Sequence, residues 1–511
     1  MHRRLFLKAA SAPFISRFGR AAAAERRFDP SFGTAGEALR AMAAGAISSR
    51  ELTEHVVARI RKFNPKINAF LLLLEEQALE RARQADEARA AGKARGPLHG
   101  LPVLTKDSFA TAGIRTTSGS KMLAKHVPKE DAVAVARLRG AGAILVGKTN
   151  LPEFASDLQS YNEIAGTTNN PWDASRTPGG STGGGAAALA AGFGFLELGS
   201  DIGGSIRTPC HFCGVYGHKP TLNVVPVDGH IPPPPATIAP LPDLAVAGPM
   251  ARSAEDLLLE LRVIGGPVRA EAAAWRWNLR PPRRARLRDY RIGFVLDDPF
   301  CPVASDVKRV MAGALDALRK AGVALAEGWP RGFDPQAAWE SYSRLLAAVV
   351  GPGMEPSQIQ KIREGAGSAW GHYAKGWIDG MTFSHQEWLR HTEARLKARA
   401  VWQEHFRTHD AFLMPVNIVP AFPHDHKLTF FERTVATADG PRLYADMLRW
   451  ISPATFSGCP ATVAPIGRTA TGLPVGIQIV GPYLEDATPI DVAARLADVT
   501  GGFQAPAGLS G

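Results

Sequence analysis

Apolar residues along this chain repeat with two different periods, one typical of helices and one typical of buried strands. A helix is predicted from Ser48, which has capping-box spacing with Glu51, to the Asn64–Pro65 step. Its apolar face repeats every three or four residues: Leu52, Val56, Ile60 and Phe63. Other stretches with helical composition or periodicity are residues 75–95, 132–139, 186–191, 304–321 and 383–405.

Short apolar runs between these helices predict strands. Residues 101–105 form one such run, which ends at Lys106, and residues 143–146 form another. Three more lie in the carboxy-terminal third: residues 411–414, 461–464 and 475–480. Residues 215–250 are rich in proline and are predicted to be loop. Because helices alternate with short buried strands, the fold class we expect is α/β.

The composition is that of a globular protein with a sizeable core. The chain has 511 residues, of which 45% are hydrophobic and 21% are charged. No apolar run reaches the ~20 residues that a membrane-spanning helix needs, so we expect no membrane span. No internal repeat or low-complexity linker divides the body of the chain into domains.

The net charge of +11 raises the question of nucleic-acid binding, but its distribution argues against that function. Five basic residues lie in the first 24 residues, which contain no acid: Arg3, Arg4, Lys8, Arg17 and Arg20. A second cluster, residues 276–291, is typical of a solvated linker that leads into a strand at 292–295. We therefore expect no nucleic-acid partner.

The four cysteines exclude a fold built on disulfides. Cys210 and Cys213 flank a histidine, but a zinc site would need a second ligand pair, and Cys301 and Cys459 stand alone. We expect buried thiols and no metal. A disulfide between Cys210 and Cys213 stays open if the protein is exported.

The amino terminus carries a separate signal. Residues 2–8 resemble the twin-arginine export signature, and a short apolar stretch follows at residues 9–15. Small residues then offer a cleavage site near Ala23 or Ala24. We expect residues 1–24 to be a signal peptide and the protein to be periplasmic. The alternative is a basic tail on a cytoplasmic protein.

The candidate chemistry lies in the run from Gly179 to Ser205, which holds two serines framed by glycines. Glycine allows positive φ and lets a ligand approach backbone N–H groups. Ser181 and Ser205 therefore place two hydroxyls beside backbone donors, the layout of a nucleophile with an oxyanion hole. One such serine alone would be typical of an ordinary tight turn.

Lys106, at the end of a predicted strand, adds a candidate base. A strand-end lysine alone is typical of a surface charge. In a dry pocket, however, loss of hydration lowers the pKa of a lysine, so that the neutral amine can accept a proton. None of the 14 histidines lies in a recognisable triad motif.

Taken together, these segments resemble the amidase signature family. The blocks that carry the resemblance lie in the family's order between about residues 48 and 482: residues 97–102 with Lys106–Asp107, 147–154, 179–184, 201–207, 212–221 and 472–482. The resemblance implies a single large α/β/α sandwich around a wide mixed β-sheet. The amidase domain would span residues 25–511, with a variable substrate-pocket region at about 325–450.

The resemblance also implies a role for each site residue. Ser205 would attack the amide carbonyl, and Lys106 would be the general base. Ser181, which would follow a cis peptide bond in the chain, would relay the proton between them. The oxyanion hole would use the N–H groups of Ile202, Gly203, Gly204 and Ser205. Structural support would come from Gly180, Thr182, Asp201 and Arg207. No cofactor and no metal are implied.

The expected function is hydrolysis of a carboxylic acid amide to an acid plus ammonia or an amine. The expected partner is a small-molecule amide, and a homodimer is compatible with the sequence. Aromatic residues of the variable region would line an apolar acyl pocket or form core: Trp339, Tyr342, Trp370, Tyr373, Trp377, Phe430 and Tyr444.

Three alternatives compete with this function. The first is an amidotransferase subunit for glutaminyl-tRNA formation, against which stand the export signal and Ile202, where that subgroup commonly has threonine. The second is a non-catalytic binding protein on an amidase scaffold, which intact Lys106, Ser181 and Ser205 oppose. A phosphate-binding loop is the third, but residues 179–185 lack the Gly-Lys-[Ser/Thr] ending.

Overall fold

A computed structural model describes residues 28–233, 243–268, 271–427 and 429–509. In this part of the chain, one mixed sheet of 11 strands runs through the molecule in the order β1-β3-β2-β6-β8-β7-β14-β15-β11-β9-β10. The α/β fold with a wide mixed sheet is therefore confirmed. The predicted signal peptide at residues 1–24 lies outside the described residues.

The bounds of the sheet's strands are β1 Phe70–Leu73, β2 Pro102–Lys106, β3 Ile144–Thr149, β6 Leu196–Asp201, β7 Tyr216–Lys219, β8 Val246–Ala251, β9 Arg291–Phe294, β10 Ala324–Glu327, β11 Ala411–Pro415, β14 Ala461–Arg468 and β15 Pro474–Val480. Two short hairpins are separate from the sheet: β4 Tyr161–Asn162 with β5 Gly166–Thr167, and β12 Thr434–Thr437 with β13 Gly440–Leu443.

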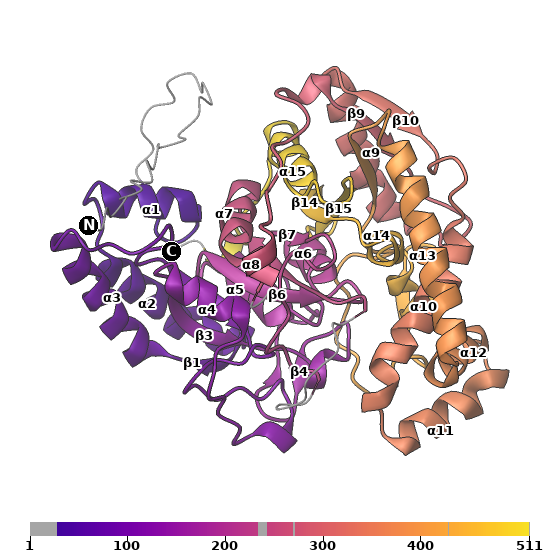
Figure 1. Cartoon of the computed structure of the whole chain (residues 1–511), viewed down its shortest axis with the longest axis horizontal. Helices are drawn as coiled ribbons and strands as arrows, with labels where there is room; N and C mark the ends of the chain where they lie inside the picture. The colour runs from indigo at the N-terminus through magenta and orange to yellow at the C-terminus, as the bar shows by residue number, and fades with distance from the viewer. Residues whose placement is uncertain (1–27, 234–242, 269–270, 428, 510–511) are drawn as a thin grey trace, which may run out of the picture.

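The α-helices are α1 Ala35–Ala43, α2 Ser49–Ile67, α3 Glu75–Ala90, α4 Val133–Gly140, α5 Gly183–Ala190, α6 Arg207–Cys213, α7 Ala254–Ile264, α8 Glu271–Ala274, α9 Ser305–Lys320, α10 Pro335–Val350, α11 Pro356–Glu364, α12 Gly371–Thr382, α13 His385–His405, α14 Ser452–Ser457 and α15 Ala487–Thr500. Figure 1 shows α1 to α3 at the end of the molecule near β1, and α10 to α13 at the opposite end. No helix among the described residues has both the length and the apolar composition to cross a membrane.

Two predicted boundaries were wrong. Helix α2 does not end at the Asn64–Pro65 step but includes Pro65 in its last turn and ends at Ile67, before Asn68, whose φ of 55° is left-handed. Residues 215–250 are not all loop, because β7 and β8 lie at the two ends of this stretch. These strands are buried on every residue, so their Gly- and Pro-containing sequences fill central sheet positions that local composition disfavours.

The sheet places the ends of two strands side by side where the predicted catalytic residues lie. Strands β2 and β6 pair in parallel, with Thr105 opposite Leu198, so their carboxyl ends reach the same edge of the sheet. In α/β sheets this edge is where ligands bind. Lys106 is the last residue of β2, and Asp201 is the last residue of β6.

Helix α5 packs so closely against the sheet that side chains larger than its own would not fit. Its sequence, GGGAAALA, is buried on every residue. A Cβ on Gly184 would lie 2.4 Å from the backbone N of Asn150, and one on Gly185 would lie 2.4 Å from Oε1 of Glu197. Because only small residues allow this approach, the helix brings the preceding Ser181 close to the strand ends.

Candidate active site

Lys106 and Ser181 meet at the junction of β2 and α5. The Nζ of Lys106 lies 2.6 Å from the Oγ of Ser181, and both residues are buried. The Gly180–Ser181 peptide bond is cis, as the resemblance implied. Ser160 holds the turn after it, because its hydroxyl donates to the carbonyl of Gly179 and accepts from the N–H of Gly183. The structure therefore brings two of the three predicted catalytic residues into direct contact.

The environment of Lys106 favours a neutral amine. Burial lowers its pKa from 10.5 to about 7, although the charges of Glu197 and Asp201 act in the opposite direction. Burial also raises the pKa of Glu197 to about 8, so that this carboxyl is largely protonated at neutral pH. A lysine of this kind can accept a proton near pH 7.

Ser205 follows the second glycine loop and remains 5% exposed. The loops of the two serines are joined by a hydrogen bond from the N–H of Thr182 to the carbonyl of Ser205, with a length of 3.1 Å. The hydroxyl of Thr182 donates to the carbonyl of Ser200 at 3.4 Å, so this residue links the same two segments twice.

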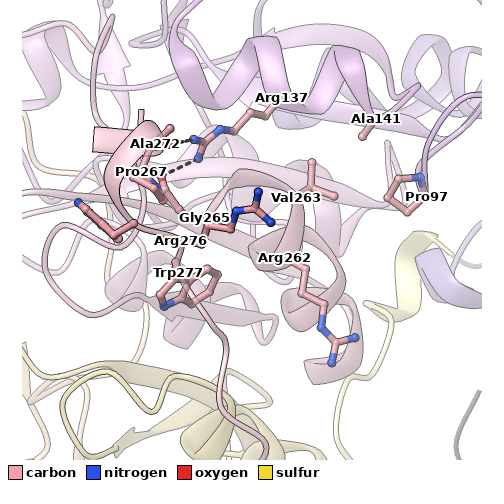
Figure 2. Close-up of a pocket in the computed structure, with 12 residues that line it drawn as sticks. Pro97, Arg137, Ala141, Arg262, Val263, Gly265, Pro267, Ala272, Arg276 and Trp277 are labelled. Carbon is pink, nitrogen blue, oxygen red and sulfur yellow. Dashed lines mark hydrogen bonds between the residues drawn. The ribbon is translucent and has the colours of Figure 1, made fainter. Parts of the chain in front are cut away.

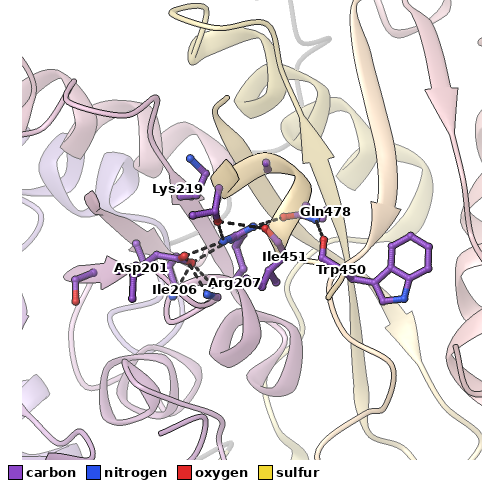
Figure 3. A network of polar contacts seen from close by, with 12 residues as sticks. Asp201, Ile206, Arg207, Lys219, Trp450, Ile451 and Gln478 are labelled. Atoms are coloured by element: carbon purple, nitrogen blue, oxygen red, sulfur yellow. Dashed lines mark hydrogen bonds and ion pairs between the residues drawn. The ribbon is translucent and has the colours of Figure 1, made fainter. Parts of the chain in front are cut away.

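A buried ion pair holds the loop after β6. Arg207 donates to both carboxylate oxygens of Asp201, at 2.8 and 3.0 Å, and both side chains are fully enclosed. Burial disfavours the charged carboxylate, but Arg207 outweighs this effect and the pKa of Asp201 is lowered. Figure 3 shows that the guanidinium also reaches Ile451 and Gln478, on elements from the carboxy-terminal part of the chain.

This network changes the predicted oxyanion hole. The N–H of Gly204 donates to Oδ1 of Asp201 at 3.1 Å, and the N–H of Ile206 donates to Oδ2. The predicted role of Gly204 therefore competes with a bond that the loop already makes. Within the described part of the chain, the N–H groups of Ile202, Gly203 and Ser205 have no hydrogen-bond acceptor, so they remain available to a ligand oxygen.

Three site residues were not found from the sequence. Ser200 contacts Lys106 at 3.0 Å, and His230 contacts Ser200 at 2.9 Å. Tyr342, named only as one of several aromatic residues, donates to the carbonyl of Ile202 at 2.9 Å. Ser200 is adjacent to the motif residue Asp201, which was a usable signal. His230 and Tyr342 reach the site only through tertiary packing.

Most of the aromatic side chains of the variable region are core. Trp339, Tyr342, Tyr373, Trp377 and Tyr444 are buried, and Trp370 and Phe430 are partly buried against the same core. The hydroxyl of Tyr342 nevertheless lies 3.9 Å from a Cβ built on Gly203. The variable region therefore reaches the glycine loop at this position.

A surface hollow elsewhere is separate from this site. It is lined by residues such as Arg137, Arg262 and Trp277, and by none of the predicted site residues (Figure 2). Arginines of the basic cluster pair with carboxylates: Arg283 with Glu485, Arg284 with Asp410 and Arg286 with Asp289. Their charge is thus partly neutralised within the chain.

The four cysteines are free and buried, including Cys210 and Cys213 on α6. Burial raises the pKa of Cys213 above that of an ordinary thiol, so it remains protonated at neutral pH. Within the described ranges, no cluster of three or more histidine, cysteine or acidic side chains has the arrangement of a metal site.

Comparison with known proteins agrees with this architecture. Residues 51–489 match the model of the Amidase family, and the chain belongs to that family of amide-cleaving enzymes. A curated relative from Anaeromyxobacter sp. (strain K), one of the subunits of its glutamyl-tRNA(Gln) amidotransferase, is 34% identical over 501 residues, which cover 92% of this chain and 96% of the relative.

Two solved structures extend the comparison. A crystal structure of an amidase is 28% identical, with a TM-score of 0.73, and the match covers 91% of this chain and 99% of the amidase. The structure of 6-aminohexanoate cyclic dimer hydrolase with its substrate is 25% identical, with a TM-score of 0.74, and the match covers 93% of this chain and 98% of the hydrolase.

Proposed function

We propose that this chain is an amidase that hydrolyses the C–N bond of a linear carboxylic acid amide. The observation that carries the proposal is the 2.6 Å contact between Lys106 and Ser181, with a lysine pKa of about 7, beside the loop of Ser205. A lysine of ordinary pKa would be protonated at neutral pH and would have no lone pair to offer.

The reaction would run in two halves. Lys106 takes the proton of Ser181 while Ser181 takes the proton of Ser205, whose oxygen adds to the amide carbonyl. The carbonyl oxygen, now negative, accepts from the N–H groups of Ile202 and Gly203. When the C–N bond breaks, Ser181 returns a proton to the leaving nitrogen, and ammonia or an amine departs. Water then enters by the same proton path and releases the acid from Ser205.

The acyl group would be apolar. A Cβ on Gly203 would lie 3.2 Å from Cδ2 of Leu448 and 3.9 Å from the hydroxyl of Tyr342. A group bound at Gly203 would therefore lie beside Leu448 and the uncharged side chain of Tyr342, both from the variable region. This arrangement supports amides of aliphatic or aromatic acids over those of charged acids.

The test is release of ammonia or amine from a panel of aliphatic, aromatic and cyclic amides. The cyclic amides address the relative whose name states a cyclic dimer as substrate. We expect turnover of at least one linear amide and its loss in Ser205→Ala, while Ser305→Ala, at the start of α9, retains full activity. Undiminished turnover in Ser205→Ala would exclude Ser205 as the nucleophile.

An amidotransferase subunit is the second candidate, because the first relatives are subunits of this kind. In that case the purified chain alone would release little ammonia from simple amides, and glutamine would be the preferred donor. Glutamine hydrolysis that rises on addition of the other subunits of a bacterial amidotransferase, with no activity on the apolar amides, would favour this function over the first.

We also propose export to the periplasm, supported by the paired Arg3 and Arg4. Cell fractionation of the full chain should place the wild-type protein in the periplasm and an Arg3→Lys/Arg4→Lys variant in the cytoplasm. An unchanged distribution would refute the signal.

A further inference from the structure

His230 reaches the lysine through one intervening hydroxyl. The Nε2 of His230 lies 2.9 Å from the Oγ of Ser200, and that oxygen lies 3.0 Å from the Nζ of Lys106. The other ring nitrogen, Nδ1, lies 3.0 Å from the carbonyl oxygen of Pro232. The ring also meets Phe109 edge to face, with centroids 5.0 Å apart.

These contacts fix the direction of each hydrogen bond. A carbonyl oxygen only accepts, so Nδ1 of His230 carries the proton and Nε2 of the neutral ring is an acceptor. The hydroxyl of Ser200 must then donate to His230, which leaves only oxygen lone pairs facing Lys106. Burial, together with the charge of Lys106, lowers the pKa of His230 to about 4, so the ring is neutral at pH 7. The carboxyl groups that act on Lys106 itself are Glu197 and Asp201, both on β6.

A neutral lysine has two N–H groups and one lone pair. If Ser200 can only accept, Lys106 donates an N–H to it and keeps its lone pair for the hydroxyl of Ser181. If the Ser200 hydroxyl instead turned toward Lys106, it would occupy that lone pair, and the base would be blocked. The direction of one buried O–H bond thus decides whether the lysine can act.

We propose that His230 is a positioning residue for the general base: by accepting a hydrogen bond from the Ser200 hydroxyl, it keeps the lone pair of Lys106 directed at Ser181. This inference rests on the proposed function, in which Lys106 is the base. It adds Ser200 and His230 to the site as groups that orient the base and do not carry the transferred proton.

The experiment compares His230→Phe with His230→Gln. Phenylalanine keeps the ring packing against Phe109 but accepts no proton, whereas the carbonyl of glutamine can accept from Ser200. In His230→Phe we expect kcat to fall about 3- to 10-fold with KM unchanged, because a rate change of this size corresponds to the loss of one neutral hydrogen bond. Because the free Ser200 hydroxyl would bond to neutral Lys106 only, the acid limb of the pH profile should also move below about pH 7, by up to about one pH unit. His230→Gln should restore both quantities.

Two controls separate positioning from a loss of structure. In a Ser200→Ala background, His230→Phe should change kcat by less than about 2-fold, because the intermediary is gone. His405→Gln replaces a histidine of α13 whose pKa burial also lowers to about 4, and it should leave kcat and the acid limb unchanged. An unshifted acid limb in His230→Phe, or a Gln variant as slow as the Phe variant, would overturn the inference.

A readout without substrate distinguishes this inference from the proposed function. A fluorophosphonate probe labels an activated serine, and intact mass spectrometry gives the labelling rate of Ser205 against pH. If no amide is cleaved but labelling shows the same dependence on His230, the amidase function fails and the inference stands. No labelling of wild-type Ser205 at any pH would overturn both.

Discussion

The pKa of Lys106 makes a prediction about stability as well as activity. Lys106→Met keeps a side chain of similar length and removes the cation. We expect this variant to be inactive and, near pH 6, more stable than the wild-type protein. Both results would follow if Lys106 is needed for catalysis but lowers the free energy of unfolding, as desolvated groups in active sites commonly do.

The magnitude follows from the shift itself. The folded-state pKa is about 7, against 10.5 for an unperturbed lysine. At about 1.4 kcal/mol per unit, the cost of holding the protonated lysine in the folded state reaches up to about 5 kcal/mol. Methionine leaves Ser181 and Ser200 without one partner, which costs about 1–3 kcal/mol. The expected gain near pH 6 is thus about 2–4 kcal/mol.

The sign of the pH dependence is the sharper test. Below about pH 7 the lysine is protonated in both states, so the full cost is present. Between about pH 7 and 10.5 the folded protein binds fewer protons than the unfolded chain, so wild-type stability rises with pH. The advantage of Lys106→Met should therefore shrink by about 3 kcal/mol between about pH 6 and pH 9.5.

Urea unfolding of both proteins at the two pH values measures this difference. The control is Lys397→Met, which removes an exposed lysine that pairs with Glu393 on the surface. Its effect should be small and independent of pH. An advantage of Lys106→Met that stays constant from about pH 6 to 9.5 would refute a depressed lysine pKa.

Three further variants test the packing around the site. Asp201→Asn leaves the buried Arg207 charge without its partner, and thermal unfolding should show a loss of about 3–5 kcal/mol; a loss under about 1 kcal/mol would contradict the buried ion pair. Gly185→Ala places a Cβ 2.4 Å from Glu197 and should cost about 1–3 kcal/mol by urea titration, unless α5 can shift. Tyr342→Phe removes the hydrogen bond to the carbonyl of Ile202. The loss should be at most about 1 kcal/mol in the activation free energy from kcat and smaller in the free energy of unfolding. An effect on stability alone would separate Tyr342 from catalysis.

Much of the fold could be predicted from local patterns. The helix after Ser48 has its capping box, and the strand that ends at Lys106 has the predicted end. Both elements are specified by residues close together in the chain. By contrast, β7 and β8 were missed because glycine and proline in their sequences disfavour strands locally, while the centre of the sheet holds them in place.

The site shows the same division. Lys106, Ser181 and Ser205 stand in motifs and were predicted as a catalytic group, and the structure brings Lys106 and Ser181 into contact. His230 has no motif, and it meets Ser200 only because the chain after β7 returns past the end of β6. Equally, the bond from Gly204 to Asp201 depends on side-chain direction in a loop, which spacing does not encode.

The network around Arg207 has a consequence for the order of events during synthesis. Its guanidinium bonds to the carbonyl of Ile451, to Thr455 and to Gln478, which the ribosome adds 244 to 271 residues later. Strand β14 must also insert beside β7 before the middle of the sheet is complete. In a nascent chain, both serines are therefore synthesised long before the residues that hydrogen-bond to Arg207 and hold their loop. The loop after β6 therefore gains its full set of bonds only after Gln478 has been synthesised.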